Sequence, residues 1–493
     1  MKKKSILIVL STILCMNLHA QDVPNAIYFL PVPTNNPYSA QFINDAAQYE
    51  WGKSVRENNL GTRTQAEKDM SWDLESYINT FSEIIGIEIS ERRTQNIYDL
   101  LTYGYRYAKK SIENSQASYY YKRPYVYYEE ESLIPNSDEE YQTTSSYPSA
   151  QAAFGWTLGM LLSEVCPDKQ NVILKRAYEI GTSSVIAGYN WQSDTETGRE
   201  LACAVVALIH SHQGILHLVK SAQDEYQKKK AQTRRSSSEP YLYAEDLPDP
   251  TKYLPDPPVE GTAQYDYDVT LYNDNKSIRE TSRGQTAVTD ANSSLENLIS
   301  IFAPYFGKNI SASSTPEIYE LLSSMYPIAT EAIFDSKAHY SRVRPYVLFD
   351  EHTGYPADED DLRDSGAYPS GHSFLGWLSA LTLSEVNPSQ LTQLMKRAYE
   401  YGQSRVILGY HWQTDVTAGR LVAGAVFARL HGSRDFIDQM ERAIDEFKGA
   451  SSIKTLETSS DAEAPIYTIG GVRLNGQPTR HGIYIQGHKK VVR

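Results

Sequence analysis

Apolar side chains recur along much of the chain at the spacing of helices that bury one face. Leu375, Leu378 and Leu381 lie three residues apart, and similar patterns run through 396–408 and 420–430. The strict alternation that is typical of strands is scarce. The sequence therefore predicts an all-α helical bundle, with its motifs at helix starts and in connecting loops.

One long pattern occurs twice. The segment YPSAQAAFGWTLGMLLSEV begins at Tyr147, and YPSGHSFLGWLSALTLSEV begins at Tyr368, with identical residues at nine of 19 positions. The short motifs KRAYE and RPYV also occur in both places, each pair 221 residues apart. Because chance similarity does not keep one register across several motifs, the sequence predicts a tandem duplication, with two helical-bundle domains.

Changes in composition set the expected domain borders. The charged, Ser-rich and Pro-rich stretch after the first copy predicts an exposed linker over 228–250, and a second polar stretch predicts another over 449–464. The first copy is then expected over 21–227 and the second over 251–448. A tail remains at 465–493.

The N-terminus has the pattern of a secretory signal peptide. Lysines at positions 2 to 4 precede an apolar run over 6–18, and Ala20 offers a small residue for cleavage. We expect residues 1–20 to be removed on export, with an uncleaved membrane anchor as the alternative. No later stretch is long and apolar enough to predict a membrane-spanning helix.

Composition narrows the range of partners. Hydrophobic residues make up 41% of the 493 residues and charged residues 22%, which is typical of a globular protein. The formal net charge of −14 argues against nucleic acid as the main partner, since phosphate backbones require a basic face. A homo-oligomer is compatible with the sequence.

Two cysteines follow the predicted signal peptide. Cys166 and Cys203 have Asn387 and Gly424 at the equivalent places of the second copy, so the thiols are not part of the shared framework. Export permits a disulfide, but two buried thiols fit equally well, and spacing alone leaves the pairing open.

The second copy carries a set of groups that suits an oxyanion. Lys337, Arg344 and Arg405 supply three positive charges, and arginine side chains match the oxygens of a tetrahedral anion. Ser370 and Gly371 precede an apolar helical run, and the backbone N–H groups at such a helix start favour an anion. These residues are the predicted phosphate-binding set.

Two histidines and an aspartate of the same copy suit phosphoryl transfer. His411 is a candidate nucleophile, Asp415 lies four residues later and can orient its ring, and His372 can protonate a leaving oxygen. Each feature alone has an ordinary structural explanation, such as a surface ion pair or a metal ligand. Their occurrence together, in three ordered clusters, favours catalysis.

These clusters resemble the three-part signature of the type 2 phosphatidic acid phosphatase superfamily, which includes vanadium haloperoxidases. The surrounding segments GYHWQTD, SGAYPSGHSFLGW and MKRAYEYGQSRV are most similar to bacterial class A non-specific acid phosphatases. The resemblance covers nearly all of 253–447. It implies an all-α fold and hydrolysis of small phosphomonoesters without a metal or another cofactor.

The resemblance also implies a role for each residue of the second copy. His411 would attack phosphorus and become a phosphohistidine, Asp415 would orient it, and His372 would protonate the leaving group and later activate water. The remaining residues would hold the phosphoryl oxygens: Lys337, Arg344, Ser370, Gly371 and Arg405.

The first copy keeps the frame and loses most of these reactive groups. At the five changed positions it has Gln116, Ala150, Gln151, Ser184 and Asn190. Only Arg123, Ser149 and Asp194 are retained. Since the amide of Asn190 cannot form a phosphohistidine, we expect a catalytically inactive domain that packs against the second copy, or alternatively one that binds a ligand or regulates it.

Two other functions compete with an exported acid phosphatase. One is a vanadate-dependent haloperoxidase, because vanadate mimics phosphate in the same kind of pocket. The other is a non-enzymatic surface protein that binds a ligand or acts as a scaffold. The complete set of reactive residues in the second copy favours the phosphatase.

The C-terminal segment differs from the rest of the chain. Residues 465–493 contain short apolar runs, an Asn475-Gly476 turn signal and a basic end, which predict a β-rich tail. The segment resembles the sorting domains that Bacteroidetes use for type IX secretion, which implies delivery to the periplasm, the cell surface or the medium. A terminal hairpin without a sorting role is the alternative.

Overall fold

The computed structural model describes residues 23–231 except 72 and 213, residues 246–449, and three strands between 466 and 492. The predicted signal peptide, most of the first linker and nearly all of the second lie outside the described residues. Residues up to Phe447 form one compact unit that contains both copies, and the segment from Lys448 onward forms a second unit.

Among the described residues, the elements of the first copy are all helices, as predicted. Its elements are η1 (Ala26–Tyr28), α2 (Ala40–Asn58), α3 (Leu60–Asp69), α4 (Leu74–Ile85), α5 (Gln95–Ser118), α6 (Pro124–Tyr127), η2 (Pro135–Ser137), α7 (Asp138–Tyr141), α8 (Ala150–Val165), η3 (Pro167–Lys169), α9 (Gln170–Ile186), α10 (Gln192–His210) and α11 (Ile215–Ala231).

The second copy repeats this series. Its elements are η5 (Pro250–Lys252), α12 (Ala263–Lys276), α13 (Ser282–Asp290), α14 (Leu295–Phe306), α15 (Pro316–Tyr340), α16 (Pro345–Leu348), η6 (Pro356–Asp358), α17 (Glu359–Leu362), α18 (Gly371–Val386), η7 (Pro388–Gln390), α19 (Leu391–Leu408), α20 (Gln413–His431) and α21 (Arg434–Lys448). The bounds of α18 and α20 are those of α8 and α10 shifted by 221 residues.

Sequence signals explain where the central helices begin. Ser149 and Ser370 are the N-caps of α8 and α18, and each hydroxyl accepts a hydrogen bond from a backbone N–H of the first turn. Trp156 and Trp377 are fully buried within these two helices. Apart from Gly371, His372 and Leu375, every residue of the two helices is buried, as expected of helices at the centre of a core.

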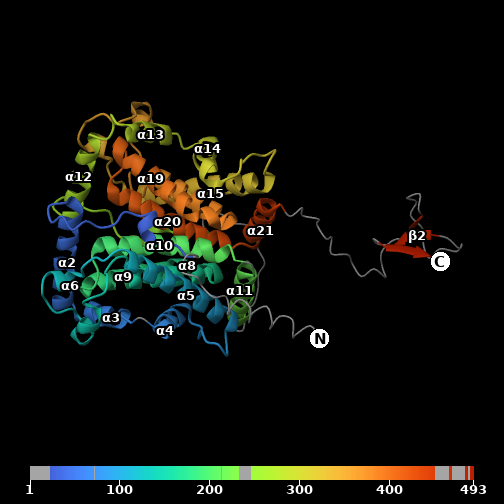
Figure 1. Ribbon diagram of the computed structural model, residues 1–493, viewed down its shortest axis with the longest axis horizontal. Coiled ribbons are helices and arrows are strands. Elements are labelled where there is room, and N and C mark those ends of the chain that lie inside the picture. The colour runs from blue at the N-terminus through green and yellow to red at the C-terminus, as the bar shows by residue number, and fades with distance from the viewer. Residues whose placement is uncertain are drawn as a thin grey trace. The chain divides into compact units, whose positions relative to one another are not determined.

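The two copies pack through their central helices. In Figure 1, α10 and α20 run side by side between the lower first copy and the upper second copy, and α8 and α18 also contact the opposite copy. Gly424 on α20 permits this close approach, because a Cβ there would lie 2.5 Å from the sulfur of Cys203 on α10. Arg420 also donates to Glu200 across the interface at 2.8 Å, and both side chains are buried.

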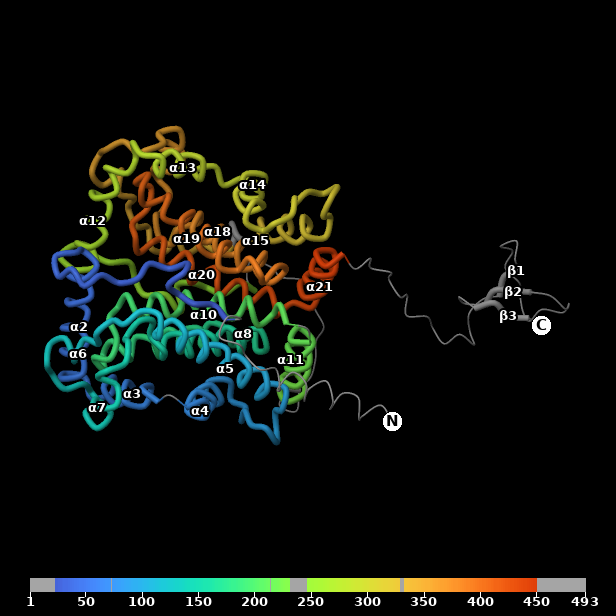
Figure 2. The backbone as a smooth tube through the Cα atoms, in the orientation of Figure 1, coloured from blue at the N-terminus to red at the C-terminus, as the bar shows by residue number. Residues whose placement is uncertain are grey.

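The N-terminal helix of each copy adds a second zone of contact. Figure 2 shows α2 near α12 at one end of the unit, where the two helices also pack together. Asp45 on α2 accepts from the backbone and hydroxyl of Ser193, and Asp268 on α12 does the same for Thr414. Each carboxylate thereby fixes the first turn of the central helix in its own copy.

The structure adds detail to three of the sequence-based expectations. Helix α11 continues to Ala231, so the first residues of the predicted 228–250 linker are helical. Cys166 and Cys203 are both free and buried. Within the described ranges no single helix is long and apolar enough to cross a membrane, although the bent pair of α10 and α11 satisfies the criteria of length and composition.

The C-terminal unit contains a small antiparallel sheet. Strands β1 (Ile466–Thr468), β2 (Ile483–Gln486) and β3 (Lys489–Val492) pair in the order β1-β2-β3. Tyr467 lies opposite Ile485 in the first pair of strands, and Tyr484 lies opposite Val491 in the second. A tail with strands agrees with the prediction for 465–493.

Candidate active site

The predicted site residues of the second copy come from the ends of five helices and one loop. Lys337 lies in the last turn of α15, and Arg344 is the N-cap of α16. Ser370, Gly371 and His372 open α18, Arg405 lies in the last turn of α19, and Asp415 lies in the first turn of α20. His411 is in the short loop between these last two helices.

A left-handed residue ends α19 and turns the chain towards this loop. Gly409 has φ +87°, a conformation that glycine adopts without strain, and a Cβ there would lie 2.5 Å from an Arg279 nitrogen. The N–H groups of Tyr410 and His411 then bond the carbonyl of Arg405 at 3.0 and 3.3 Å. The turn therefore ties the position of His411 to that of Arg405.

His411 lies between a carboxylate and a guanidinium. Its Nδ1 is 3.3 Å from Asp415 Oδ2, and its Nε2 is 3.1 Å from Arg344 Nη1. Since the guanidinium can only donate, Nε2 must be the acceptor, and the proton of the neutral ring is on Nδ1. Burial and the nearby cations Arg344 and Lys337 hold the pKa of His411 well below its usual value. The ring is thus neutral, with its lone pair on Nε2.

The Asp415 carboxylate is held by two donors besides the ring of His411. Its Oδ2 accepts from the backbone N–H of Trp412 at 2.8 Å, and its Oδ1 accepts from Arg342 Nη1 at 2.5 Å. The other terminal nitrogen of Arg342 donates to Asp268 Oδ2 at 2.7 Å. This fully buried carboxylate therefore has a fixed orientation towards His411.

Arg342 was missed by the sequence reasoning. It lies two residues before Arg344, within the motif KAHYSRVRP, and its side chain is 8% exposed. The first copy has Tyr121 at the equivalent position, so the loss of this arginine accompanies the loss of the other reactive groups. Comparison of the two copies at this position was the signal that could have found it.

Of the three predicted cations, Arg405 has the fewest hydrogen-bond partners. Its side chain is fully buried, yet none of its three guanidinium nitrogens has a hydrogen-bond partner among the described residues. The guanidinium lies 4.2 Å from the centre of the Tyr410 ring. Burial and the neighbouring Arg344 lower the pKa of Arg405 to about 10, so it stays charged. A buried charge with free donors requires an anionic partner.

The other two predicted cations are partly satisfied by backbone. Arg344 donates to the carbonyls of Leu362, Ser365 and Tyr410 at 2.9–3.1 Å, which fixes its plane. Lys337 Nζ donates to the Gly366 carbonyl at 2.8 Å. Burial, together with Arg344, lowers the pKa of Lys337 to about 7.

His372 has a carbonyl partner that the sequence did not reveal. Its Nε2 lies 2.8 Å from the carbonyl oxygen of Ala291, just after α13, and must donate to it. Burial and Arg405 hold the pKa of His372 well below its usual value. In the free site His372 is therefore neutral, with its proton directed at backbone and Nδ1 available to accept another.

The equivalent region of the first copy is closed by its own hydrogen bonds. All three guanidinium nitrogens of Arg123 donate to protein oxygens, which include Thr144 Oγ1 and the Ser145 carbonyl. Asn190 donates to the Ser146 carbonyl at 2.6 Å. Asp194 Oδ1 has no partner among the described residues, and burial raises the pKa of Asp194 to about 7. Arg123, the cation retained at this place, therefore has no guanidinium nitrogen without a hydrogen bond.

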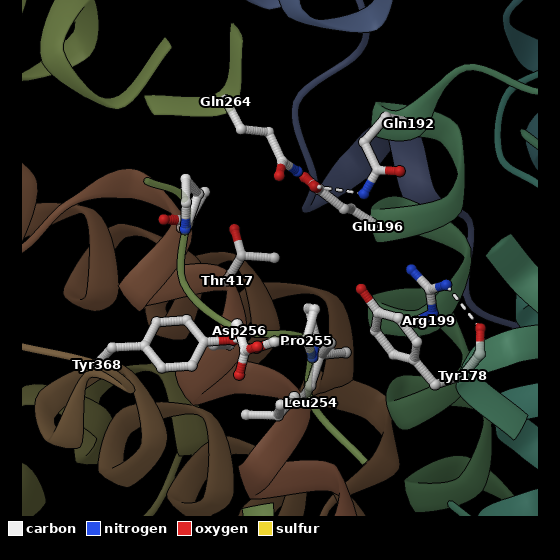
Figure 3. A pocket seen from close by; sticks show the side chains of 14 residues that line it. Tyr178, Gln192, Glu196, Arg199, Leu254, Pro255, Asp256, Gln264, Tyr368 and Thr417 are labelled. Atoms are coloured by element: carbon white, nitrogen blue, oxygen red, sulfur yellow. Dashed lines mark hydrogen bonds between the residues drawn. The ribbon is translucent and has the colours of Figure 1, made fainter. Parts of the chain in front are cut away.

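A small cavity between the copies is distinct from these residues. Figure 3 shows Gln192, Glu196 and Arg199 of the first copy facing Thr417 and other residues of the second copy. The cavity has room for about 50 Å³ and includes none of the eight predicted site residues in its lining. Its volume suits a few water molecules, because each needs roughly 10–15 Å³ of such space.

A known family and several bacterial phosphatases match part of this chain. The family description "PAP2 superfamily" matches residues 320–435, a range that includes all eight predicted site residues. A non-specific acid phosphatase of Providencia stuartii is 40% identical over 208 residues, which are 42% of this chain and 84% of that protein. A non-specific acid phosphatase of Salmonella typhimurium is 37% identical over 226 residues, 46% of this chain and 90% of that protein. An acid phosphatase of Zymomonas mobilis is 32% identical over 202 residues, 41% of this chain and 76% of that protein.

The all-helical compact unit and the matched range place the site in a known class of proteins. The chain belongs to the PAP2 superfamily, in the group of the bacterial non-specific acid phosphatases. The resemblance inferred from the three motifs is thereby confirmed.

Proposed function

We propose that the second copy hydrolyses phosphomonoesters through a phosphohistidine on His411, as an acid phosphatase. The observation that supports this most directly is the buried, unpartnered guanidinium of Arg405, which shares one site with the neutral His411 ring. Free cationic donors suit the phosphoryl oxygens, and the lone pair on Nε2 suits attack on phosphorus.

The first chemical step forms a bond from His411 Nε2 to phosphorus and breaks the bond to the ester oxygen. Arg344 Nη1 donates a hydrogen bond to His411 Nε2 in the structure. When substrate binds, Arg344 donates to a phosphoryl oxygen instead, which frees the lone pair of His411 Nε2. Asp415 Oδ2 accepts from Nδ1–H and stabilises the positive charge that develops on the ring. Arg405, Lys337 and the N-terminus of α18 hold the other oxygens.

The second step hydrolyses the phosphohistidine. Water attacks phosphorus, the bond to His411 Nε2 breaks, and inorganic phosphate leaves with the water oxygen. His372 Nδ1 can accept the proton of the attacking water, since Nε2 is held by the Ala291 carbonyl.

The leaving oxygen needs a proton donor, and His372 is not protonated in the site without substrate. Burial and Arg405 hold the pKa of His372 well below its usual value, so its ring is neutral before substrate binds. A substrate monoanion brings its own proton below a pH of about 6, the second pKa of a phosphate monoester. That proton can pass to His372 or to the leaving oxygen, which accounts for activity on the acidic side of neutrality.

We expect Lys337 to set a limit on the alkaline side. As the pH rises through about 7, Lys337 in the free enzyme loses its proton and the site loses one cation. With p-nitrophenyl phosphate as substrate, kcat/KM should therefore fall above pH 7 more steeply than substrate ionisation requires. In Lys337→Gln the extra decline should be absent, and kcat/KM at pH 5 should drop about 10²-fold. The exposed Lys396→Gln serves as control, and an unchanged profile in Lys337→Gln would contradict this role.

We also propose that the first copy is catalytically inactive and that 21–227 and 251–448 are duplicated domains. The first copy has Asn190 in place of the nucleophile, and every nitrogen of Arg123 is already bonded within the protein. The partnerless Oδ1 of Asp194 is consistent with the replacement of Arg342 by Tyr121.

A turnover assay separates the phosphatase from the two other candidate functions. We expect steady hydrolysis of p-nitrophenyl phosphate in excess EDTA, since Lys337, Arg344 and Arg405 supply the positive charge. A haloperoxidase would instead oxidise bromide after vanadate loading, and a binding protein would do neither. Loss of hydrolysis in chelator and its recovery with a divalent ion would contradict a metal-free reaction.

Export to the periplasm, the cell surface or the medium is part of the same proposal. It is supported by the charged start, the apolar run and Ala20 in the sequence, and by the β-rich tail. The N-terminal residue of the mature protein, expected to be Gln21, tests the cleavage.

A further inference from the structure

A second group of ionisable side chains lies where the copies meet, away from the active site. Glu164 on α8 and His210 on α10 belong to the first copy, and Glu385 on α18 and His431 on α20 hold the equivalent positions 221 residues later. All four side chains are fully buried. We call these four residues the interface quartet.

The two histidines direct one nitrogen each at the same carboxylate. His431 Nε2 lies 2.9 Å from Glu385 Oε2, and His210 Nδ1 lies 3.7 Å from the same oxygen. The centres of the two imidazole rings are 4.0 Å apart. One ligand atom from each of these three residues lies within 4.8 Å of the others.

The outer nitrogen of each ring is already fixed by an acceptor. His431 Nδ1 is 2.9 Å from the Phe427 carbonyl, and His210 Nε2 is 3.1 Å from Glu164 Oε2. Metal-bound histidines in proteins have this arrangement, in which a carbonyl or carboxylate holds the outer N–H and sets the tautomer. The lone pair of each inner nitrogen is then directed at Glu385.

Several polar atoms of the quartet have no hydrogen-bond partner in the described part of the chain. They are His210 Nδ1, Glu164 Oε1 and Glu385 Oε1, all buried. Leaving such atoms unsatisfied is costly. A divalent cation between the rings would bind His210 Nδ1 and Glu385 Oε1, and its two charges would balance the two carboxylates.

The spacing of the inner atoms suits zinc. Bonds of about 2.0–2.1 Å in a tetrahedral site separate neighbouring ligand atoms by roughly 3.3 Å. The observed separations of 2.9 and 3.7 Å lie on either side of that value. Two imidazoles and a carboxylate are also ligands that zinc prefers.

We propose that the interface quartet binds one zinc ion that joins the two copies. His210, His431 and Glu385 are its ligands, with both Glu385 oxygens available, and Glu164 orients His210. Because the ligands come from both copies and are fully enclosed, zinc enters as the copies pack and stays bound in the folded chain.

This zinc has no part in hydrolysis. His431 is at the opposite end of α20 from Asp415, about 24 Å along the helix at 1.5 Å per residue. Glu385 is similarly about 20 Å from His372 along α18. The proposal therefore does not depend on the phosphatase reaction, and activity in EDTA is compatible with it.

Elemental analysis of the full chain, purified without a metal-binding tag, tests the proposal. We expect about one zinc per chain, retained on dialysis against EDTA and released when the chain unfolds in guanidinium. Glu385→Gln and His210→Gln should each contain less than a tenth of this amount, while the exposed His217→Gln should match the wild type.

A second measurement keeps the test decisive if the quartet variants fail to fold. Wild-type chain produced with cobalt in place of zinc should show the intense visible absorption of four-coordinate Co²⁺. Wild-type protein without stoichiometric metal, or with metal that dialysis removes, would overturn the proposal and leave the quartet as a buried network of shared protons. Zinc that remains in both Glu385→Gln and His210→Gln would overturn it equally.

Discussion

His411→Ala is expected to lower kcat for p-nitrophenyl phosphate by roughly 10⁴-fold or more, because nothing else in the site can take its place as nucleophile. His411 Nε2 carries a lone pair that Arg344 can release to substrate, and Nδ1 on the other side of the ring is 3.3 Å from Asp415. Substrate binding should change less, since the cations remain. Steady-state kinetics on purified protein measure both quantities.

The first copy provides a matched control for this substitution. Asn190→Ala removes the equivalent side chain and a buried hydrogen bond to Ser146, so it should affect stability more than turnover. Residual hydrolysis by His411→Ala near the wild-type rate would mean that the first copy is active or that another group attacks phosphorus.

Arg405→Ala is expected to reduce kcat/KM by about 10²–10³-fold and to weaken inhibition by inorganic phosphate. The substitution removes a full charge and three nitrogens that have no hydrogen-bond partner, whereas Arg344 and Lys337 already donate to backbone carbonyls. Arg405→Lys should recover only part of the loss, because an ammonium cannot bond two oxygens with a planar fork.

The melting temperature of Arg405→Ala distinguishes an anion-binding role of Arg405 from a purely structural one. Removing a buried charge that has no protein partner should leave the melting temperature unchanged or raise it, apart from the lost contact with the Tyr410 ring. The matched Ser184→Ala in the first copy should leave kinetics unchanged. A large drop in stability with an unchanged inhibition constant for phosphate would contradict the anion-binding role.

The elements and the reactive clusters could be predicted from sequence because their signals are local. Ser370 before an apolar run predicts the start of α18, and the constant 221-residue spacing predicts equivalent helices in both copies. The order of the three motifs is enough to nominate the eight site residues, although their roles stay predictions.

Contacts between segments that are distant in the sequence could not be predicted, because no local sequence pattern specifies them. The bond from His372 to the Ala291 carbonyl joins α18 to the end of α13, and it changes which nitrogen can accept a proton. The side chain of Arg342 donates hydrogen bonds to Asp415 and Asp268, which are both more than 70 residues away in the sequence. The interface quartet requires the packing of one copy on the other, which no single motif specifies.

During turnover, phosphate is expected to become attached to His411 and to no residue of the first copy. Brief reaction with labelled p-nitrophenyl phosphate, an alkaline quench and digestion with trypsin test it by mass spectrometry. Cleavage after Arg405 and Arg420 isolates the peptide 406–420 of the second copy, and cleavage after Arg176 and Arg199 isolates 177–199 of the first. We predict one phosphoryl group on His411 in the peptide 406–420 and none in 177–199. Label in the first-copy peptide, or turnover with no labelled histidine in 406–420, would contradict the account.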